Sequence, residues 1–111
     1  FMNVEIKDDF VLFLSEENTF DKFIEYFTNQ HTKFAENNII IYLSSKLTLD
    51  EKHISLFLKY ADHHQDNGTT FVVVYSNIDV DSFPESFNIV PTLQEAEDVL
   101  EMENIQRDLG L

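Results

Sequence analysis

The 111-residue chain contains no cysteine, only two glycines and only seven lysines and arginines. Without cysteine it has no disulfide, no thiolate zinc site and no cysteine nucleophile. A phosphate-binding loop places several glycines before a helix. Because Gly68 and Gly110 are the only glycines in the sequence, the usual nucleotide-binding motifs are excluded. No apolar run approaches the length of a membrane span and no leader-like segment opens the chain. We therefore expect a cytoplasmic protein.

The shortage of basic residues leaves 21 acidic residues largely unbalanced and gives a formal net charge of −14. Affinity for nucleic acid comes mainly from cations that neutralise phosphates, so we expect no direct binding to DNA or RNA, and none to anionic membranes. The chain is nevertheless 43% apolar and 14% aromatic, which is too much for a disordered acidic tail. We predict one folded domain over residues 2–111, with Phe1 set aside because it precedes Met2.

The first half of the chain changes its apolar period twice. Two short apolar stretches separated by Asp8-Asp9 predict a hairpin, formed by residues 4–7 and 10–14. Phenylalanines at helical spacing then predict a helix that begins after Asn18 or Thr19 and ends at Asn37-Asn38. The continuous apolar run over residues 39–43 predicts a strand covered on both faces.

The second half repeats the alternation of helix and strand. Thr48 and Glu51 have the spacing of a capping box, so we predict a helix from Leu49 with a stop at Asn67-Gly68. Its buried stripe is expected at Ile54, Phe57, Leu58 and Ala61. A strand over 71–75, a loop over 76–87 with one short helical turn, and a strand at 89–90 follow. Thr92 and Glu95 form a second capping box before the last helix, whose buried stripe is Leu93, Ala96, Val99 and Leu100.

The resulting order is β-β-α-β-α-β-β-α. Apolar strands that alternate with helices predict an α/β fold, with a mixed, mostly parallel sheet that opens with a β-hairpin.

The segment Asp62-His63-His64-Gln65-Asp66 suggests a metal site at first sight. His63 and Asp66 have the i, i+3 spacing that brings two ligands together on a helix, but His64 points about 100° away from His63. Two such ligands near a polar helix end are more often a solvated face, and we predict no metal site here.

Catalytic motifs are missing as well. Ser44, Ser45 and Ser76 follow predicted strands, but none lies in the glycine-bounded turn that presents a serine nucleophile. Carboxylate pairs such as Glu97 and Glu101 are expected by chance in a chain this acidic. We expect a non-catalytic protein without a cofactor.

Two segments remain as candidates for interaction. The first begins at the carboxyl end of a central strand and continues into the next helix, where free amides could bind an anion or a partner's carboxylate. Its candidate partner-binding residues are Ser44, Ser45, Lys46, Thr48, Asp50, Glu51, Lys52 and His53. The second is the loop with Phe83, Pro84 and Phe87, although burial of both phenylalanines at the edge of the core is about twice as probable.

The order of elements, together with the segments 39–43, 71–75 and 90–96, resembles the STAS domain family of bacterial anti-sigma-factor antagonists. The resemblance covers nearly the whole chain. It implies a STAS-like fold and a protein partner, such as an anti-sigma-type regulator. Family members that are controlled by phosphorylation carry Asp-Ser-Ser-Gly, or Asp-Ser/Thr-x-Gly, at the helix start. A partner kinase phosphorylates a hydroxyl of this motif. This chain has Asp50-Glu51-Lys52-His53 there, which implies docking without that switch or with a permanent negative charge at Glu51.

The C-terminal segments 90–96 and 101–110 are also similar to short proteins that carry the name ribonuclease Z. That name implies tRNA 3′-end processing at a two-metal site, for which the sequence offers no ligand set. Three hypotheses follow: a STAS-like regulator that docks a protein through residues 44–53, a ribonuclease or an accessory of one, and a structural homodimer that buries Phe83 and Phe87.

Overall fold

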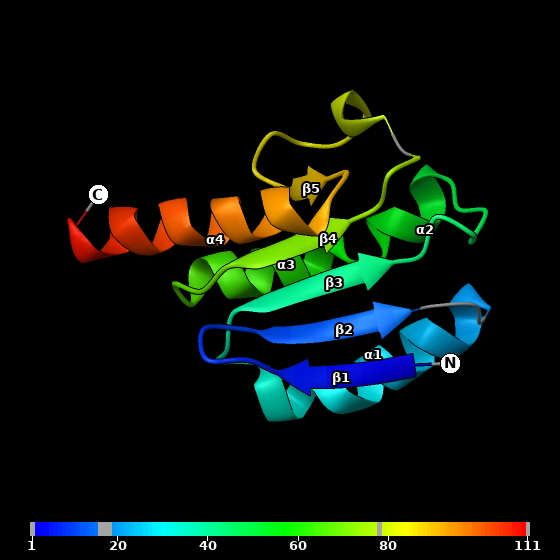
Figure 1. The fold of residues 1–111 in the computed structure, drawn as a ribbon, viewed down its shortest axis with the longest axis horizontal. Helices are drawn as coiled ribbons and strands as arrows, with labels where there is room; N and C mark the ends of the chain where they lie inside the picture. Colours follow the sequence, from blue (N-terminus) through cyan, green and yellow to red (C-terminus); the bar gives the residue numbers. More distant parts are fainter. Residues whose placement is uncertain (1, 16–18, 78, 111) are drawn as a thin grey trace.

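The computed structural model describes residues 2–15, 19–77 and 79–110. They form a five-stranded mixed sheet flanked by helices, an α/β fold (Figure 1). The elements in chain order are β1 (Met2–Ile6), β2 (Val11–Ser15), α1 (Phe20–Phe34), β3 (Ile39–Leu43), α2 (Glu51–Ser55), α3 (Leu58–Asp66), β4 (Phe71–Val74), the 3-10 helix η1 (Val80–Ser82), β5 (Asn88–Val90) and α4 (Leu93–Asp108).

The strands lie in the sheet in their chain order, β1-β2-β3-β4-β5. β1 runs antiparallel to β2, with Ile6 opposite Val11, and the remaining pairs are parallel. The hairpin predicted at the start of the chain is therefore confirmed. Its turn is closed by the Lys7 N–H, which donates to the Phe10 carbonyl at 2.8 Å.

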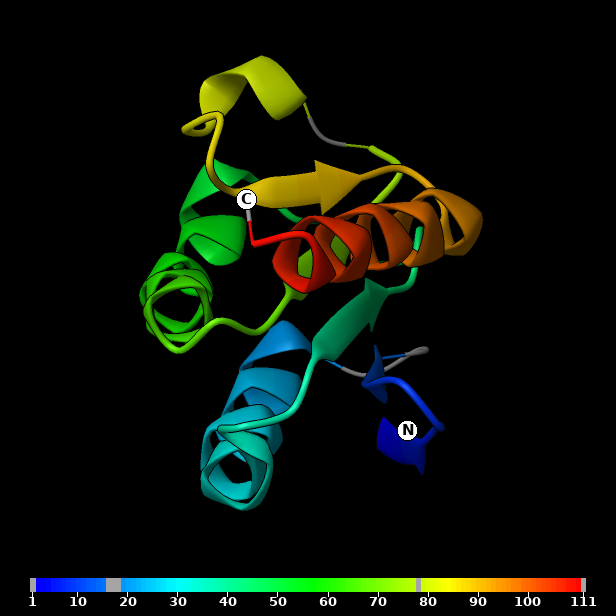
Figure 2. The ribbon, with the colours of Figure 1, turned by 90° about the vertical axis from the view of Figure 1, so that its left-hand side faces the viewer.

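Alternate residues of each strand face opposite sides of the sheet, and the two sides are covered unequally. One side, here called the α1/α3 face, buries Phe13, Ile41 and Val73 against α1, α2 and α3. The other, here called the α4 face, buries Leu12, Ile40 and Val72 with Ala96 of α4. In Figures 1 and 2, α4 lies over β4 and β5, while none of the helices in the described part of the chain covers this face of β1 and β2.

Phenylalanines dominate the core on the α1/α3 face. Phe27 of α1 meets the Phe13 ring edge-to-face at a centroid distance of 4.9 Å and the Tyr60 ring at 4.8 Å. Such pairs add specific geometry to the burial of large apolar area. The loop phenylalanines Phe83 and Phe87 belong to the same core and are only 8% and 5% exposed. The edge-of-core interpretation is therefore confirmed, and these rings are not available for the homodimer surface considered above.

The helix expected from Leu49 differs from the structure in two ways. Asp50, rather than Thr48, is the N-cap, and the first helical residue is Glu51. The expected single helix is also interrupted between α2 and α3. The N–H groups of Leu56 and Phe57 donate to His53 O and Ile54 O at 3.3 and 3.0 Å, and these i to i−3 bonds tighten the turn there.

The predicted N-cap of α4 and the predicted glycine stop after α3 are confirmed, whereas α1 ends at Phe34, before the predicted stop at Asn37-Asn38. The Thr92 hydroxyl accepts from the Glu95 N–H at 3.2 Å, as expected for the N-cap of α4. Gly68 has a φ of +76°, the left-handed conformation for which a glycine stop is suited. Thr19 is the N-cap of α1 without a side-chain hydrogen bond, whereas the alternative cap Asn18 lies outside the described residues. None of the described helices has the length and apolar character needed to cross a membrane.

Candidate functional site

The predicted docking segment is an exposed loop fixed by bonds to the sheet. It follows β3, and the Ser44 N–H donates to the carbonyl of Ser15 at the end of β2, at 3.0 Å. The Tyr75 hydroxyl, which is buried just after β4, donates to Leu47 O at 2.5 Å and accepts from the Leu49 N–H at 3.2 Å. One buried hydroxyl therefore binds the loop backbone at Leu47 and Leu49. Six of the eight predicted residues remain exposed: Ser45, Lys46, Thr48, Asp50, Glu51 and Lys52.

The free backbone amides at the start of α2 are capped by nearby side chains. The Asp50 carboxylate accepts from the N–H groups of Lys52 and His53 at 3.0 and 3.2 Å. His53 Nδ1 in turn accepts from the Asp50 N–H at 3.1 Å, which completes a capping box. The His53 N–H, which donates to the carboxylate, is the main reason that the pKa of Asp50 lies below its usual value. The amides expected to bind an anion or a partner's carboxylate are thus already used by Asp50.

Two further contacts tie this segment to the loop before β5. Asn77 Nδ2 donates to Ser45 O at 3.2 Å, and the Ser82 hydroxyl donates to Glu51 Oε1 at 2.8 Å. The start of α1 completes the surroundings, because Thr19, Phe20 and Asp21 line a hollow of about 370 Å³ together with Lys46, Thr48 and His53. The sequence did not indicate that α1 would border this surface.

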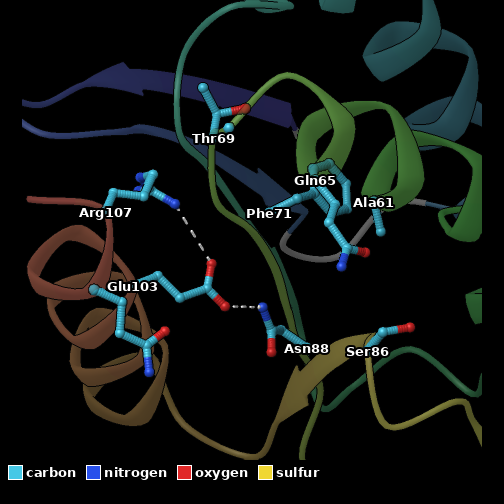
Figure 3. A pocket seen from close by; sticks show the side chains of 10 residues that line it. Ala61, Gln65, Thr69, Phe71, Ser86, Asn88, Glu103 and Arg107 are labelled. Atoms are coloured by element: carbon cyan, nitrogen blue, oxygen red, sulfur yellow. Dashed lines mark hydrogen bonds and ion pairs between the residues drawn. The ribbon is translucent and has the colours of Figure 1, made fainter. Parts of the chain in front are cut away.

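A second polar feature lies at the opposite end of the sheet, where β4 and β5 begin (Figure 3). Glu103 of α4 accepts from the Thr70 hydroxyl at 2.8 Å and from Asn88 Nδ2 at 2.9 Å. Arg107 Nη2 donates to the Thr70 hydroxyl at 3.0 Å, and its Nη1 lies 3.9 Å from Glu103 Oε1. Glu103, Asn88 and Arg107 line a cleft of about 310 Å³. Together with Thr70 they satisfy one another's hydrogen bonds, so their evident role is to fix α4 to the sheet.

Three histidines of α1 and α3 come together in the structure, a cluster that the sequence did not indicate. His64 is fully buried, and its Nε2 lies 2.8 Å from Nε2 of His31, which is 8% exposed. His64 Nδ1 lies 2.7 Å from the Thr69 hydroxyl, and the exposed His63 stacks edge-on near both rings. The solvated-face interpretation of His63 and Asp66 is confirmed because both are exposed, whereas the sequence did not indicate that His64 is buried.

The His31–His64 contact requires a single proton between the two Nε2 atoms, with one ring donating and the other accepting. Burial, together with the charges of His31 and His63, lowers the pKa of His64 to about 4. Burial lowers the pKa of His31 as well. The pair is thus a neutral, hydrogen-bonded part of the core at neutral pH. Among the described residues, no group of three or more histidine or carboxylate side chains could hold a metal ion.

No model of a known protein family matches this chain, and a search of curated protein sequences finds no significant match.

Proposed function

We propose that this chain is a STAS-like regulatory domain that binds a protein partner through the surface of residues 44–53 and does not itself catalyse a reaction. The single observation that carries the proposal is the way this surface is built. A polar loop at the carboxyl end of β3 stays exposed while Tyr75, Asn77 and Ser82 fix its backbone and side chains from beneath. A surface that is ordered before binding loses less conformational entropy when it docks.

The chemistry of the surface favours a protein over other ligands. It presents Lys46 and Lys52 beside Asp50 and Glu51, a mixture of both charges around the polar Ser45 and Thr48. Mixed charge suits a partner with a complementary pattern and gives specificity more than affinity. The capping bonds of Asp50 fix its carboxylate in place, while Glu51 supplies a permanent negative charge at the helix start. A regulator of the anti-sigma type is the partner class that the STAS resemblance implies.

The proposal is tested by affinity capture from the native lysate with wild type and with a Glu51→Ala, Lys52→Ala double variant. A matched control is Lys22→Ala with Glu25→Ala, which removes the same two charges from exposed positions on α1. We expect the first pair to lose a specific partner that the wild type and the control both retain. Identical partner lists for all three proteins would refute this docking surface.

A further inference from the structure

The α4 face of the sheet is only half covered. α4 packs on β4 and β5, so none of the described helices lies over the neighbouring part of this face, on β1 and β2 (Figures 1 and 2). In α/β folds helices normally cover both faces of a sheet with parallel strands. An uncovered stretch is expected where the strand side chains are polar, as Glu5 of β1 is.

The β2 side chains on this face are instead apolar. Leu12 and Leu14, with Phe10 just before the strand, belong to the small core of the α4 face. Phe10 and Leu14 are only partly buried. Phe10 lines two adjoining hollows of about 710 and 420 Å³ beside α4, and Leu14 lines the larger one. The hollows share Asp9, Phe10 and Glu97, so together they form one groove along α4, here called the β2–α4 groove.

The length of the β2–α4 groove matches a short helix. Its α4 wall runs from Leu93 to Ile105, which corresponds to about 18 Å at the helical rise of 1.5 Å per residue. That length accommodates about three turns of a second helix lying beside α4 on the sheet. Its apolar positions would contact Phe10, Leu14 and Leu93, in the mode by which an amphipathic helix binds an apolar groove.

The charge around the groove determines which kind of helix could bind there. Among the described residues, six carboxylates line it: Glu5, Asp8, Asp9, Glu97, Asp98 and Glu101. The one lysine or arginine in its lining is Lys7, whose ammonium lies 2.9 Å from Glu5 Oε1. A second copy of this chain would bring the same acidic rim against itself, at a net charge of −14 per copy.

We infer that the β2–α4 groove is a docking site for a basic amphipathic helix of a partner protein. This site lies on the sheet face beside the turn between β1 and β2, whereas residues 44–53 follow the carboxyl end of β3, so the two sites share no residue. Apolar contacts with the floor and ion pairs with the rim would act together, and neither alone would give a localised complex.

The probe is a fluorescein-labelled, 14-residue helical peptide of leucine and lysine with all leucines on one face. Binding is measured by fluorescence anisotropy and located by peptide-induced shifts of backbone amides in NMR spectra. We expect shifts at β2 and along α4. A peptide with alanine in place of leucine, which keeps the charge and the helix, should bind at least about tenfold more weakly because the apolar anchors are missing.

Charge-matched variants separate docking from general attraction to an acidic protein. Glu97→Lys on the groove should raise Kd about tenfold, whereas Glu25→Lys, which makes the same change on α1, should leave Kd within about twofold. Equal weakening by both variants would overturn the inference, because it would show attraction to net charge alone. Both positions are exposed on helices, so neither variant should unfold the protein.

A second pair tests the apolar floor. Leu14→Asn should weaken peptide binding about tenfold. Leu56→Asn, which changes an exposed leucine away from the groove, should leave binding unchanged. Circular dichroism checks that both variants remain folded. Shifts centred outside β2 and α4 would overturn the inference. So would concentration-dependent dimerisation of the free protein that Glu97→Lys abolishes, since a second copy would then occupy the groove.

Discussion

Replacing His64 with glutamine should remove a defined part of the acid sensitivity of folding. In the folded protein the pKa of His64 is about 4, against 6.5 for an unperturbed histidine. The unfolded chain therefore binds this proton first as the pH falls. The stabilisation is fully present above pH 6.5 and is lost progressively as the pH falls toward 4.

The size of the effect follows from the two pKa values. Between pH 7 and pH 5 the linkage amounts to about 2 kcal/mol, and it approaches about 3 kcal/mol at pH 4, where it levels off. The structural cause is that His64 is fully buried among Phe71, His31 and Thr69, so an added charge is neither solvated nor paired. His63, on the exposed side of α3, is the third ring of this cluster and opposes the added charge as well.

The measurement is urea unfolding followed by far-ultraviolet circular dichroism at several pH values, since the chain contains no tryptophan. His64→Gln should be less stable at pH 7 but lose about 2 kcal/mol less than wild type between pH 7 and pH 5. Thr69→Val is the matched control: it removes a hydrogen bond to His64 without removing the titrating ring, so it should keep the wild-type slope. Parallel curves for wild type and His64→Gln would refute the reasoning.

Four further substitutions test the contacts that fix the docking loop, the start of α2 and the position of α4 on the sheet. Tyr75→Phe keeps the buried ring but removes the hydroxyl that binds the docking loop. It should lower the free energy of unfolding by about 1–2 kcal/mol and speed amide hydrogen exchange at Leu49. Slow exchange at Leu49 in the variant would contradict the role given to Tyr75 in holding the loop. Asp50→Ala should destabilise the protein by about 1 kcal/mol in thermal unfolding, while Thr48→Ala should leave the melting temperature nearly unchanged. A larger loss of stability for Thr48→Ala than for Asp50→Ala would indicate that Thr48 is the N-cap. Glu103→Gln should lower the urea midpoint by the equivalent of about 1–2 kcal/mol, and an unchanged midpoint would show that its bonds to Thr70 and Asn88 contribute nothing.

Most strands and the last helix could be predicted because their signals are local. The run Ile39–Leu43 is apolar throughout, and both of its faces are indeed buried or nearly so. Thr92 caps α4 as the sequence indicated, since no competing residue lies near it. The α/β class and the opening hairpin follow directly from such segments.

The cap of α2 was missed because two candidates lie two residues apart. Thr48 and Asp50 can both accept hydrogen bonds at a helix start, and the local pattern does not rank them. In the structure the Asp50 carboxylate accepts from two amides and His53 returns a bond to the Asp50 N–H. A histidine at the third helical position was the available signal, although glutamate and glutamine are the residues usually sought there.

The histidine pair and the β2–α4 groove depend on contacts between distant segments. His31 continues the buried stripe of Phe20, Phe23 and Phe27 on α1, so its burial could have been predicted from helical spacing. Its partner His64 is 33 residues away, and no local pattern joins them. The groove exists only because α4 lies over β4 and β5, which is a matter of packing rather than of sequence period.

The most direct test of the proposed docking surface is hydrogen–deuterium exchange of the captured complex compared with the free protein. We expect the amides of residues 44–53 to be protected when the partner is bound, and those of the exposed face of α1 to be unchanged. Protection elsewhere with no change over residues 44–53 would contradict the proposal that this loop is where the domain binds its partner.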